Sequence, residues 1–534
     1  MPSCGRGVAS RTVSVVALGE KVRGPRSRVL GLDTHPELAV TCLTVLAAVL
    51  RFTRIGHQGF WFDEASTALL VHLSPGKMLG LLPQTESTPP LYYCIAWVWA
   101  RIFGFGEAGL RSLSAVAGVL TVPVAYGVGA KLISPRAGVI VAALTATSPL
   151  LIWYSQEARS YELVVLLGAT TLLTFAYALS EPTSRAVAAW AGACALALAT
   201  HYFAVIAVVP EAAWLLVVHR RRRSVQVAVA TIAVAGLALI PLAISQQGTG
   251  NSDWIAKIPL HVRLSQVAPQ FMLGFGSPAG RWLRAIDAIV VLAAVAILWR
   301  RGEAAERRGA RVAAGLAAAG AAVMLVLLAA GVDDLITRNI IVLWLPLALV
   351  VAAGLGTTRA ARLGLAGVAV LCATGVVATV GVAVDRNLQR PDWRLVARAL
   401  GPAPARVGRA ILIQHYKTLR PLSLYQPRLS FIRRGGALVD ELVVVSIRSP
   451  QEAACWWGAA CNLIPSKAPA SVPVPGFRVI GEAHIAQFTL LRLRSARPVH
   501  LTRAMVSRAL TTTDLRNDGL ILQRPRAPSP GVTH

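Results

Sequence analysis

Long apolar runs interrupt this 534-residue chain at about eleven places, and they decide what it can fold into. A helix needs roughly 17–25 residues to cross the hydrocarbon core of a bilayer. Hydrophobic residues make up 55% of the chain and charged residues only 15%, with a mean hydropathy of +0.58. A soluble protein has no use for so much apolar surface. The sequence therefore predicts an α-helical polytopic membrane protein whose spans fall at 38–52, 110–130, 137–154, 163–179, 186–200, 202–218, 225–244, 285–299, 312–332, 340–355 and 363–384.

The basic residues indicate how these spans are oriented. A net charge of +28 and a pI of about 11.2 would also suit a nucleic-acid-binding protein. Here, however, the arginines and lysines gather in short clusters between apolar runs, which is typical of the cytoplasmic face of a membrane protein. The sequence therefore predicts a multi-pass protein of the cell membrane with membrane lipids and no nucleic acid as partners. The clusters are Lys131/Arg136, Arg185, Arg220–Arg223, Arg300/Arg301/Arg307/Arg308/Arg311 and Arg359/Arg362.

One apolar segment, 91–104, decides the topology. At about 1.5 Å per residue it reaches roughly 21 Å, short of the ~30 Å hydrocarbon core. If it does not cross, every basic cluster lies on the side of the basic N-terminal arm, whereas a crossing would put Arg220–Arg223 outside. We therefore expect an interfacial or re-entrant helix, a cytoplasmic N-terminus and an extracytoplasmic C-terminal domain.

Composition divides the chain into four expected parts. Residues 1–36 are a basic cytoplasmic arm with no apolar core of a signal peptide. Residues 37–384 form the transmembrane module, with outer loops at 57–109, 155–162 and 245–284. Residues 385–497 form a small α/β domain, with a helix expected at 392–400 and strands at 410–414, 442–447 and 488–493. The Pro- and Arg-rich residues 498–534 are expected to be a disordered tail.

Polar residues that suit chemistry recur in the loops assigned to the outer face. Asp63 and Glu64 lie in the first of them, followed by Tyr92 and Tyr93 in the stretch STPPLYY. Each group alone is more typical of a solvated helix end or an interfacial aromatic belt. Acids from two separate loops on one face favour a functional site. The further candidates are Glu157, Arg159, His201, Tyr202, Lys257 and Arg338.

Cysteines and nucleotide motifs add little. Of seven cysteines, Cys455 and Cys461 lie in a polar region and would pair if that region faces an oxidising compartment. The stretch 104–109 reads GxGxxG, but it precedes a membrane span and follows no strand, so it is a loop and not a dinucleotide site. With no nucleotide-binding fold in sight, an activated substrate is expected to arrive attached to a lipid.

In their order, the motifs resemble those of bacterial membrane glycosyltransferases of the C superfold, the group of protein O-mannosyltransferases, aminoarabinose transferases and Rgt-type enzymes. The motifs are DE at 63–64, STPPLYY at 87–93, YSQEARSYEL at 154–163 and THYFA at 200–204. The resemblance covers roughly residues 51–218 by motif and the remaining spans by layout only. It implies a polyprenyl-phosphate sugar donor and inverting transfer to a hydroxyl of a glycan, lipid or protein acceptor on the outer face, with a mannose-type sugar foremost.

The resemblance also implies roles for the candidates. Asp63 would be the general base, with Glu64 shaping the site, and Glu157 and Arg159 would lie near the donor phosphate or a divalent metal. No cofactor is certain; Glu157 and His201 would be the ligands if a metal takes part. Arg338 would bind the lipid phosphate, although Asn339 follows it where relatives usually have a tyrosine. Arg159, Arg338 and Lys257 would supply the positive charge that a phosphate leaving group needs.

Two other functions fit a polytopic chain. A glycolipid transporter or flippase is expected to have ionisable groups at the middle of the membrane and paired repeats, neither of which the sequence indicates. A non-catalytic envelope protein would bind glycan through its C-terminal domain. In that case deleting the C-terminal domain would cause the envelope phenotype, and replacing Asp63 would not.

Overall fold

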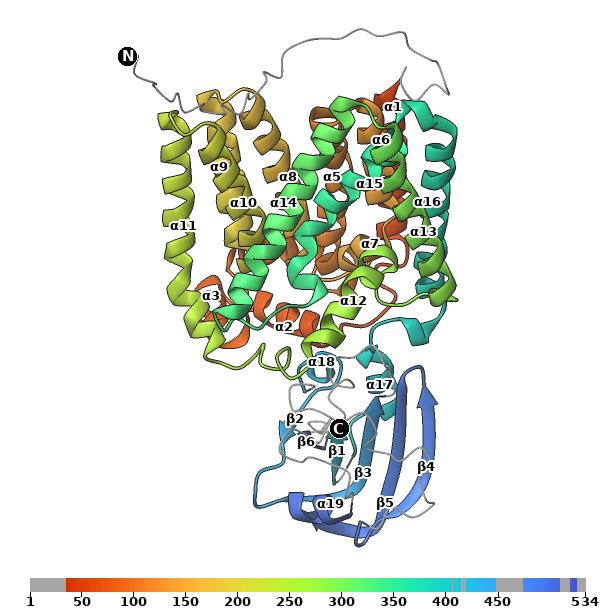
Figure 1. The fold of residues 1–534 in the computed structure, drawn as a ribbon. Coiled ribbons are helices and arrows are strands. Elements are labelled where there is room, and N and C mark those ends of the chain that lie inside the picture. Colours follow the sequence, from red (N-terminus) through yellow and green to blue (C-terminus); the bar gives the residue numbers. More distant parts are fainter. Residues whose placement is uncertain (1–34, 406, 414–418, 448–473, 510–518, 526–534) are drawn as a thin grey trace, which may run out of the picture.

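The computed structural model describes residues 35–405, 407–413, 419–447, 474–509 and 519–525. Figure 1 shows a bundle of long helices with a smaller sheet domain attached at one end. Cys455 and Cys461, which the sequence offered as a pair, lie outside the described residues.

Each of the eleven apolar runs lies on a helix or on a bent pair of helices. Seven helices in the described parts of the chain are long and apolar enough to cross a membrane, or eight if the bent pair α6–α7 counts as one span. The prediction of a helical membrane protein is therefore confirmed, while the number of crossings stays a prediction. The elements are α1 (Pro36–Phe52), α5 (Glu107–Leu132), α6 (Pro135–Thr147), α7 (Pro149–Ser155), α8 (Tyr161–Ser180), α9 (Ser184–Thr200), η2 (Tyr202–Ala204), α10 (Val205–Val218), α11 (Arg223–Gln247), α13 (Gly280–Arg301), α14 (Ala304–Ala329), η3 (Thr337–Leu343), α15 (Trp344–Gly356), η4 (Thr358–Ala360) and α16 (Ala361–Val384).

A single predicted run, 137–154, is broken in the structure. α6 and α7 meet at a bend of 56°. Pro149 has no N–H to continue the hydrogen-bond ladder of α6, and the Ser148 hydroxyl accepts a hydrogen bond from the Leu151 amide to begin α7. The bend brings the loop after α7, which carries Glu157 and Arg159, back against the bundle.

Three short helices lie at the end of the bundle that faces the sheet domain: α2 (Phe62–Val71), α3 (Pro75–Thr85) and α12 (Leu260–Leu273) (Figure 1). A fourth, α4 (Leu91–Phe103), packs with α2, α3 and α5. α4 covers the segment that the sequence interpreted as too short to cross. It has 13 residues and belongs to the shorter apolar helices. Its tyrosines pack against α2 and α5 in a separate hydrophobic cluster. Its interfacial position stays a prediction.

The C-terminal domain is a six-stranded sheet in the order β2-β6-β1-β3-β5-β4. β1 and β3 are parallel, and the other neighbouring strands are antiparallel. The expected helix at 392–400 and all three expected strands are present. The elements are η5 (Arg386–Leu388), α17 (Trp393–Leu400), β1 (Gly408–Ile413), α18 (Leu419–Ser423), β2 (Leu429–Phe431), β3 (Ala437–Ile447), β4 (Arg478–Ile485), β5 (Phe488–Leu501), α19 (Arg503–Ala509) and β6 (Gly519–Gln523).

The two faces of this sheet bury alternate residues, as a strand period of two requires. On one face Ile411 and Val443 pack with Trp393 of α17, and on the other Leu412 and Val444 join a second apolar cluster. The central strands β1 and β3 are covered on both faces. A sheet with two buried faces is the core of a domain, as the sequence predicted.

The expected disordered tail from residue 498 is wrong for the described part of it. β5 continues to Leu501, α19 follows, and β6 pairs with both β1 and β2 inside the sheet. The apolar stretch Leu520–Leu522 drives this pairing, because Leu520 and Ile521 are buried. Composition misled the prediction: the Pro- and Arg-rich flanks hid a short strand.

The sheet domain is fastened to the first outer loop. The Tyr425 hydroxyl accepts a hydrogen bond from the Phe60 amide at 2.6 Å and donates one to Glu107 at 2.7 Å. Arg420 of α18 donates to the Ser66 hydroxyl of α2 at 2.9 Å. These bonds tie the domain to the helix that carries Asp63.

Candidate active site

The acid pair Asp63-Glu64 opens α2, where carboxylates are favoured by the helix dipole. The two side chains have different environments. Glu64 is fully buried, and its carboxylate takes two hydrogen bonds from Arg111 of α5, at 2.7 and 2.6 Å, and one from the Ala158 amide at 2.9 Å. With both oxygens occupied, Glu64 positions the loop and has no room to accept a proton from substrate. Its contacts leave it no free oxygen to act as a second base, and the expectation that it shapes the site stays a prediction.

Arg111 completes this anchor by binding the loop backbone. Its guanidinium donates to the carbonyls of Ile55, Gln58 and Gly59 at 2.9–3.0 Å. Burial raises the pKa of Glu64, but the Arg111 charge and hydrogen bonds outweigh burial and hold that pKa below its usual value. The first outer loop is thus held in one conformation by a buried ion pair.

Asp63 points away from this anchor and forms an ion pair with Arg338 of η3. Arg338 Nη1 lies 3.0 Å from Asp63 Oδ2. Both side chains are nearly one-fifth exposed, 18% for Asp63 and 19% for Arg338, so the pair meets solvent at an otherwise buried cluster. Asp63 Oδ1 and the other N–H groups of Arg338 make no hydrogen bond with described residues. The structure therefore joins two residues that are 275 positions apart in the chain.

Aromatic rings surround Arg338. Its guanidinium carbon lies 5.5 Å from the centre of the Tyr161 ring and 5.2 Å from that of Trp254. Both distances suit cation–π contacts. These rings hold the guanidinium beside Asp63.

Arg159 forms the second cationic group of the site. Its Nη1 lies 2.7 Å from Glu86 Oε2 and donates a longer hydrogen bond of 3.4 Å to the Asp63 carbonyl. The guanidinium is buried, and the pKa of Arg159 is raised because the neighbouring Glu86 charge outweighs the burial that would lower it. Arg159 therefore stays charged beside the backbone of Asp63.

The tyrosines of α4 hold Glu86 and do not present themselves to a substrate. Tyr93 donates to Glu86 Oε2 at 2.6 Å, and Thr88 lies 3.1 Å from the Tyr93 hydroxyl. Tyr92 is 0% exposed and Tyr93 is 1% exposed. Tyr92 and Tyr93, which the sequence offered as binding candidates, are therefore packed by α4 against α2 and α5 with no surface open to a substrate.

Glu157 and Arg159 do not pair with each other. Glu157 instead binds Arg390, which follows the last span, with 2.8 Å between Arg390 Nη2 and Glu157 Oε2. The Arg390 guanidinium also stacks 3.9 Å above the Trp153 ring. Burial raises the pKa of Glu157 to about 7 although the Arg390 charge acts to lower it. The second loop is thus bound to the C-terminal part of the chain.

The remaining candidates are divided between the site and its surroundings. His201 lies with its ring centre 5.7 Å from that of Tyr161, and its Nδ1 accepts a hydrogen bond from the Phe203 amide. Tyr202 donates to Gln246 at 2.8 Å, away from Asp63. Lys257 is exposed in the loop before α12. Among the described residues, no group of three His, Cys, Asp or Glu side chains is placed to hold a metal ion, so Glu157 and His201 do not form one.

Three residues of the site escaped sequence reasoning: Glu86, Arg111 and Arg390. Each is the partner of a candidate that the sequence did identify. Glu86 directly precedes the STPPLYY stretch, which was a usable signal. Arg111 and Arg390 lie 47 and 233 residues from the acids they bind, and nothing local marks them.

Together these residues can perform acid–base chemistry beside an anion. Asp63 is a carboxylate with one unoccupied oxygen among the described residues and access to solvent. Two arginines flank it on the buried side. Such a base next to preorganised positive charge suits displacement of an anionic leaving group by a hydroxyl.

The helical bundle with this site on its loops, and the sheet domain attached beside them, agree with the layout that the resemblance to C-superfold glycosyltransferases implies.

Comparisons with known proteins give a family match over part of the chain and a similar fold over most of it. Residues 87–245 match the family model described as dolichyl-phosphate-mannose-protein mannosyltransferase. The apo crystal structure of ArnT from Cupriavidus metallidurans is similar over 86% of this chain and 98% of its own, with a TM-score of 0.53 and 14% identity. ArnT bound to undecaprenyl phosphate gives a TM-score of 0.49 at 13% identity over the same shares of the two chains. The oligosaccharyltransferase of Archaeoglobus fulgidus gives a TM-score of 0.41 at 12% identity, covering 76% of this chain and 67% of its own. No curated protein sequence matches.

Proposed function

We propose that this chain transfers a sugar from a polyprenyl-phosphate donor to an acceptor hydroxyl on the outer face of the cytoplasmic membrane, with Asp63 as general base. The observation that carries the proposal is the Asp63–Arg338 pair, which places a carboxylate and a guanidinium together at the partly exposed part of a buried polar cluster. The family description supports a lipid-phosphate donor, since it names dolichyl-phosphate mannose.

The roles follow from where the charges lie. The acceptor oxygen attacks the anomeric carbon of the sugar and loses its proton to Asp63 Oδ1. The bond between that carbon and the phosphate oxygen breaks, and the polyprenyl phosphate leaves with the electron pair. Arg338 has N–H groups that no described residue occupies, and these would bind the phosphate. Attack opposite the leaving group inverts the anomeric centre.

Arg159 and Glu64 act through Asp63 as positioning residues. Arg159 donates to the Asp63 carbonyl while bound to Glu86, and Glu64 fastens the same turn of α2 to Arg111. Lys257 and His201 remain expected neighbours of the donor, and a mannose-type sugar remains the expected group transferred.

The test is transfer by the Asp63→Asn variant. Membranes containing the protein receive polyprenyl-phosphate mannose, arabinose or galactose in separate reactions, and the glycosylated product is identified by mass spectrometry. Loss of a general base typically costs 10²–10⁴-fold in rate, and we expect a loss of about that size. Asp440→Asn, on a strand of the sheet domain, is the matched control and should retain full transfer. Transfer by Asp63→Asn at the wild-type rate would exclude Asp63 as the base.

A further inference from the structure

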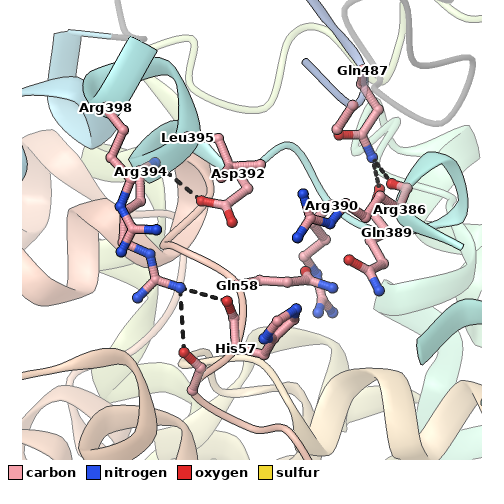
Figure 2. A pocket seen from close by; sticks show the side chains of 12 residues that line it. His57, Gln58, Arg386, Gln389, Arg390, Asp392, Arg394, Leu395, Arg398 and Gln487 are labelled. Atoms are coloured by element: carbon pink, nitrogen blue, oxygen red, sulfur yellow. Dashed lines mark hydrogen bonds between the residues drawn. The ribbon is translucent and has the colours of Figure 1, made fainter. Parts of the chain in front are cut away.

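A cavity of about 250 Å³ lies between the first outer loop and the start of the C-terminal domain, apart from Asp63. Figure 2 shows the side chains of the 385–398 stretch on one side of it and those of His57 and Gln58 on the other. Gln487 closes a third side by donating to the carbonyls of Arg386 and Gln389. We call this space the interdomain chamber.

Four arginines line the interdomain chamber, and they recur at every fourth residue: Arg386, Arg390, Arg394 and Arg398. Asp392 is the one carboxylate among the lining residues, and its Oδ1 accepts from the Arg394 amide. Arg390 and Arg394 form ion pairs with Glu157 and Glu107, which do not line the chamber. Positive charge therefore dominates the lining.

Arg386 and Arg398 differ from the other two arginines. Both are exposed, and neither guanidinium makes a hydrogen bond or ion pair with a residue that the structure describes. Across the chamber, burial and then the charges of Arg54, Arg386 and Arg394 lower the pKa of His57, against the opposing charge of Asp392. Two arginines without a partner among the described residues form an environment that would attract an anion.

The interdomain chamber borders the candidate active site. Arg390 reaches from the chamber wall to Glu157, and its guanidinium carbon lies 5.9 Å from the ring of Trp61, two residues before Asp63. The part of a bound molecule that lies near Arg390 would therefore be next to the loop that carries Asp63. This is the position expected for an acceptor.

An apolar groove continues from the chamber. It has a volume of about 130 Å³ and shares His57, Gln58 and Gln389 with the chamber lining. Its other walls include Ile152, Leu273 and Val380. Val380 is 50% exposed on α16, so the groove reaches the outer surface of the bundle, where lipid chains lie in a membrane protein. A charged chamber that opens into an apolar groove fits a molecule with an anionic head and a hydrocarbon chain.

We propose that the interdomain chamber binds the phosphate headgroup of a lipid acceptor through Arg386 and Arg398, while the lipid chain lies in the adjoining groove. The inference rests on the proposed function, since it names the class of molecule that receives the sugar. Arg386 and Arg398 lie at opposite ends of the lining in Figure 2, so they supply positive charge along the chamber, which attracts an anionic headgroup. The acceptor hydroxyl is then presented to Asp63 from the chamber side, opposite Arg338.

Binding of dodecyl phosphate to the purified full-length protein in dodecyl maltoside tests the proposal. Isothermal titration calorimetry at fixed ionic strength compares the wild type with the double variant Arg386→Ala/Arg398→Ala. Arg433→Ala/Arg434→Ala removes the same charge from an exposed turn of the sheet domain and serves as the matched control. We expect at least a tenfold loss of affinity in the first variant and none in the control.

Two further arms separate the sources of binding. Inorganic phosphate should bind at least tenfold more weakly than dodecyl phosphate, because it cannot use the groove; equal affinities would overturn the lipid assignment. Dodecyl phosphate can also occupy the donor site at Arg338, so Arg338→Ala should remove at most that second binding event and keep the one that depends on Arg386 and Arg398. Loss of binding in Arg338→Ala, with Arg386→Ala/Arg398→Ala unaffected, would place the ligand at the donor site and overturn the proposal.

The two proposals fail separately. Asp63→Asn should bind dodecyl phosphate as the wild type does, even though its rate of sugar transfer falls. If Asp63→Asn retains transfer while the chamber variant loses dodecyl phosphate binding, the catalytic assignment is wrong and the chamber stands. If Arg386→Ala/Arg398→Ala binds dodecyl phosphate with wild-type affinity, the chamber assignment is wrong, whether or not Asp63→Asn retains transfer.

Discussion

Two adjacent carboxylates at the start of α2 carry out different tasks because one is buried and the other is not. Glu64 is enclosed by Arg111 and the Ala158 amide, whereas Asp63 faces Arg338 with part of its surface exposed. Removing one partner of a buried ion pair leaves an uncompensated charge that costs about 3–5 kcal/mol. Substitutions at the two acids should therefore affect different properties.

At Glu64, the change to Gln should lower the free energy of unfolding, because Arg111 would lose its buried counter-charge. We expect a fall in the melting temperature in detergent, followed by tryptophan fluorescence. Asp63→Asn should leave the melting temperature close to that of the wild type, since the Arg338 pair is partly solvated. Equal destabilisation by both substitutions would contradict this division of roles.

Arg338 is expected to act by charge and by shape. Arg338→Ala should reduce transfer severely, whereas Arg338→Lys should restore part of the rate, because lysine keeps the charge but lacks the planar, two-pronged donor geometry that a phosphate prefers. Initial rates at varied donor concentration check this. Identical rates for the alanine and lysine variants would mean that positive charge at this position is not used.

The pH dependence of stability should report Glu157. Its pKa is raised from 4.5 to about 7 by burial. The folded protein therefore holds this proton more tightly than the unfolded chain, so the stabilising contribution is complete below about pH 4.5 and is lost as the pH rises through about 7. Between pH 5 and pH 8 the melting temperature of the wild type should fall further than that of Glu157→Gln, whose side chain cannot titrate. Parallel profiles for the two proteins would contradict the raised pKa.

Among the elements, α2 and α17 depend on each other through a glycine. A Cβ on Gly59 would lie 2.4 Å from Asp392 Oδ1 and 2.8 Å from the Cβ of Arg394. Both atoms belong to the start of α17 or its N-cap, so only a residue without a side chain lets the two segments approach. Local packing here fixes how the loop before α2 meets the C-terminal domain.

Gly59→Ala should therefore destabilise the protein and widen the interdomain chamber, because the backbone near α17 has to move. Gly80→Ala in α3 is the matched control, since a Cβ there meets nothing within 4 Å and alanine favours a helix. Melting temperatures of the two variants, with protease sensitivity of the 385–392 connection, check this. A Gly59→Ala protein as stable as the wild type would show that this contact gives way easily.

Local sequence was enough to identify most elements of this fold. Apolar runs predicted the helices because a membrane span requires a continuous stretch of about the right length. The strands were predicted from short segments rich in strand-favouring residues, such as those around Ile411 and Val443. The bend at Pro149 and the strand at Leu520–Leu522 were missed. The bend was missed because the apolar composition is continuous across it.

The polar partners of the site residues could not be predicted from local sequence. Glu86 binds Arg159 across 73 positions, a contact that only the folded chain creates.

For the whole molecule, the charge pattern predicts a cytoplasmic N-terminus and an extracytoplasmic sheet domain. In a variant whose native cysteines are replaced, single cysteines at Arg221 and Arg433 should report opposite sides. A membrane-impermeant maleimide added to intact cells should label Arg433→Cys and leave Arg221→Cys unlabelled until the cells are permeabilised. Labelling of both positions in intact cells would require a different number of crossings.

The hydrogen bonds from Tyr425 and Arg420 to the first outer loop have a consequence for anyone recombining parts of such enzymes. Phe60, Ser66 and Glu107 would each lose a polar partner if the sheet domain were exchanged for an unrelated one, and unpaired polar groups in a dry contact are costly. A functional chimera has to carry residues 55–111 and 385–525 from the same parent. The recombination unit in this architecture is discontinuous in sequence, and crossover points chosen at the apparent domain boundary near residue 385 would divide it.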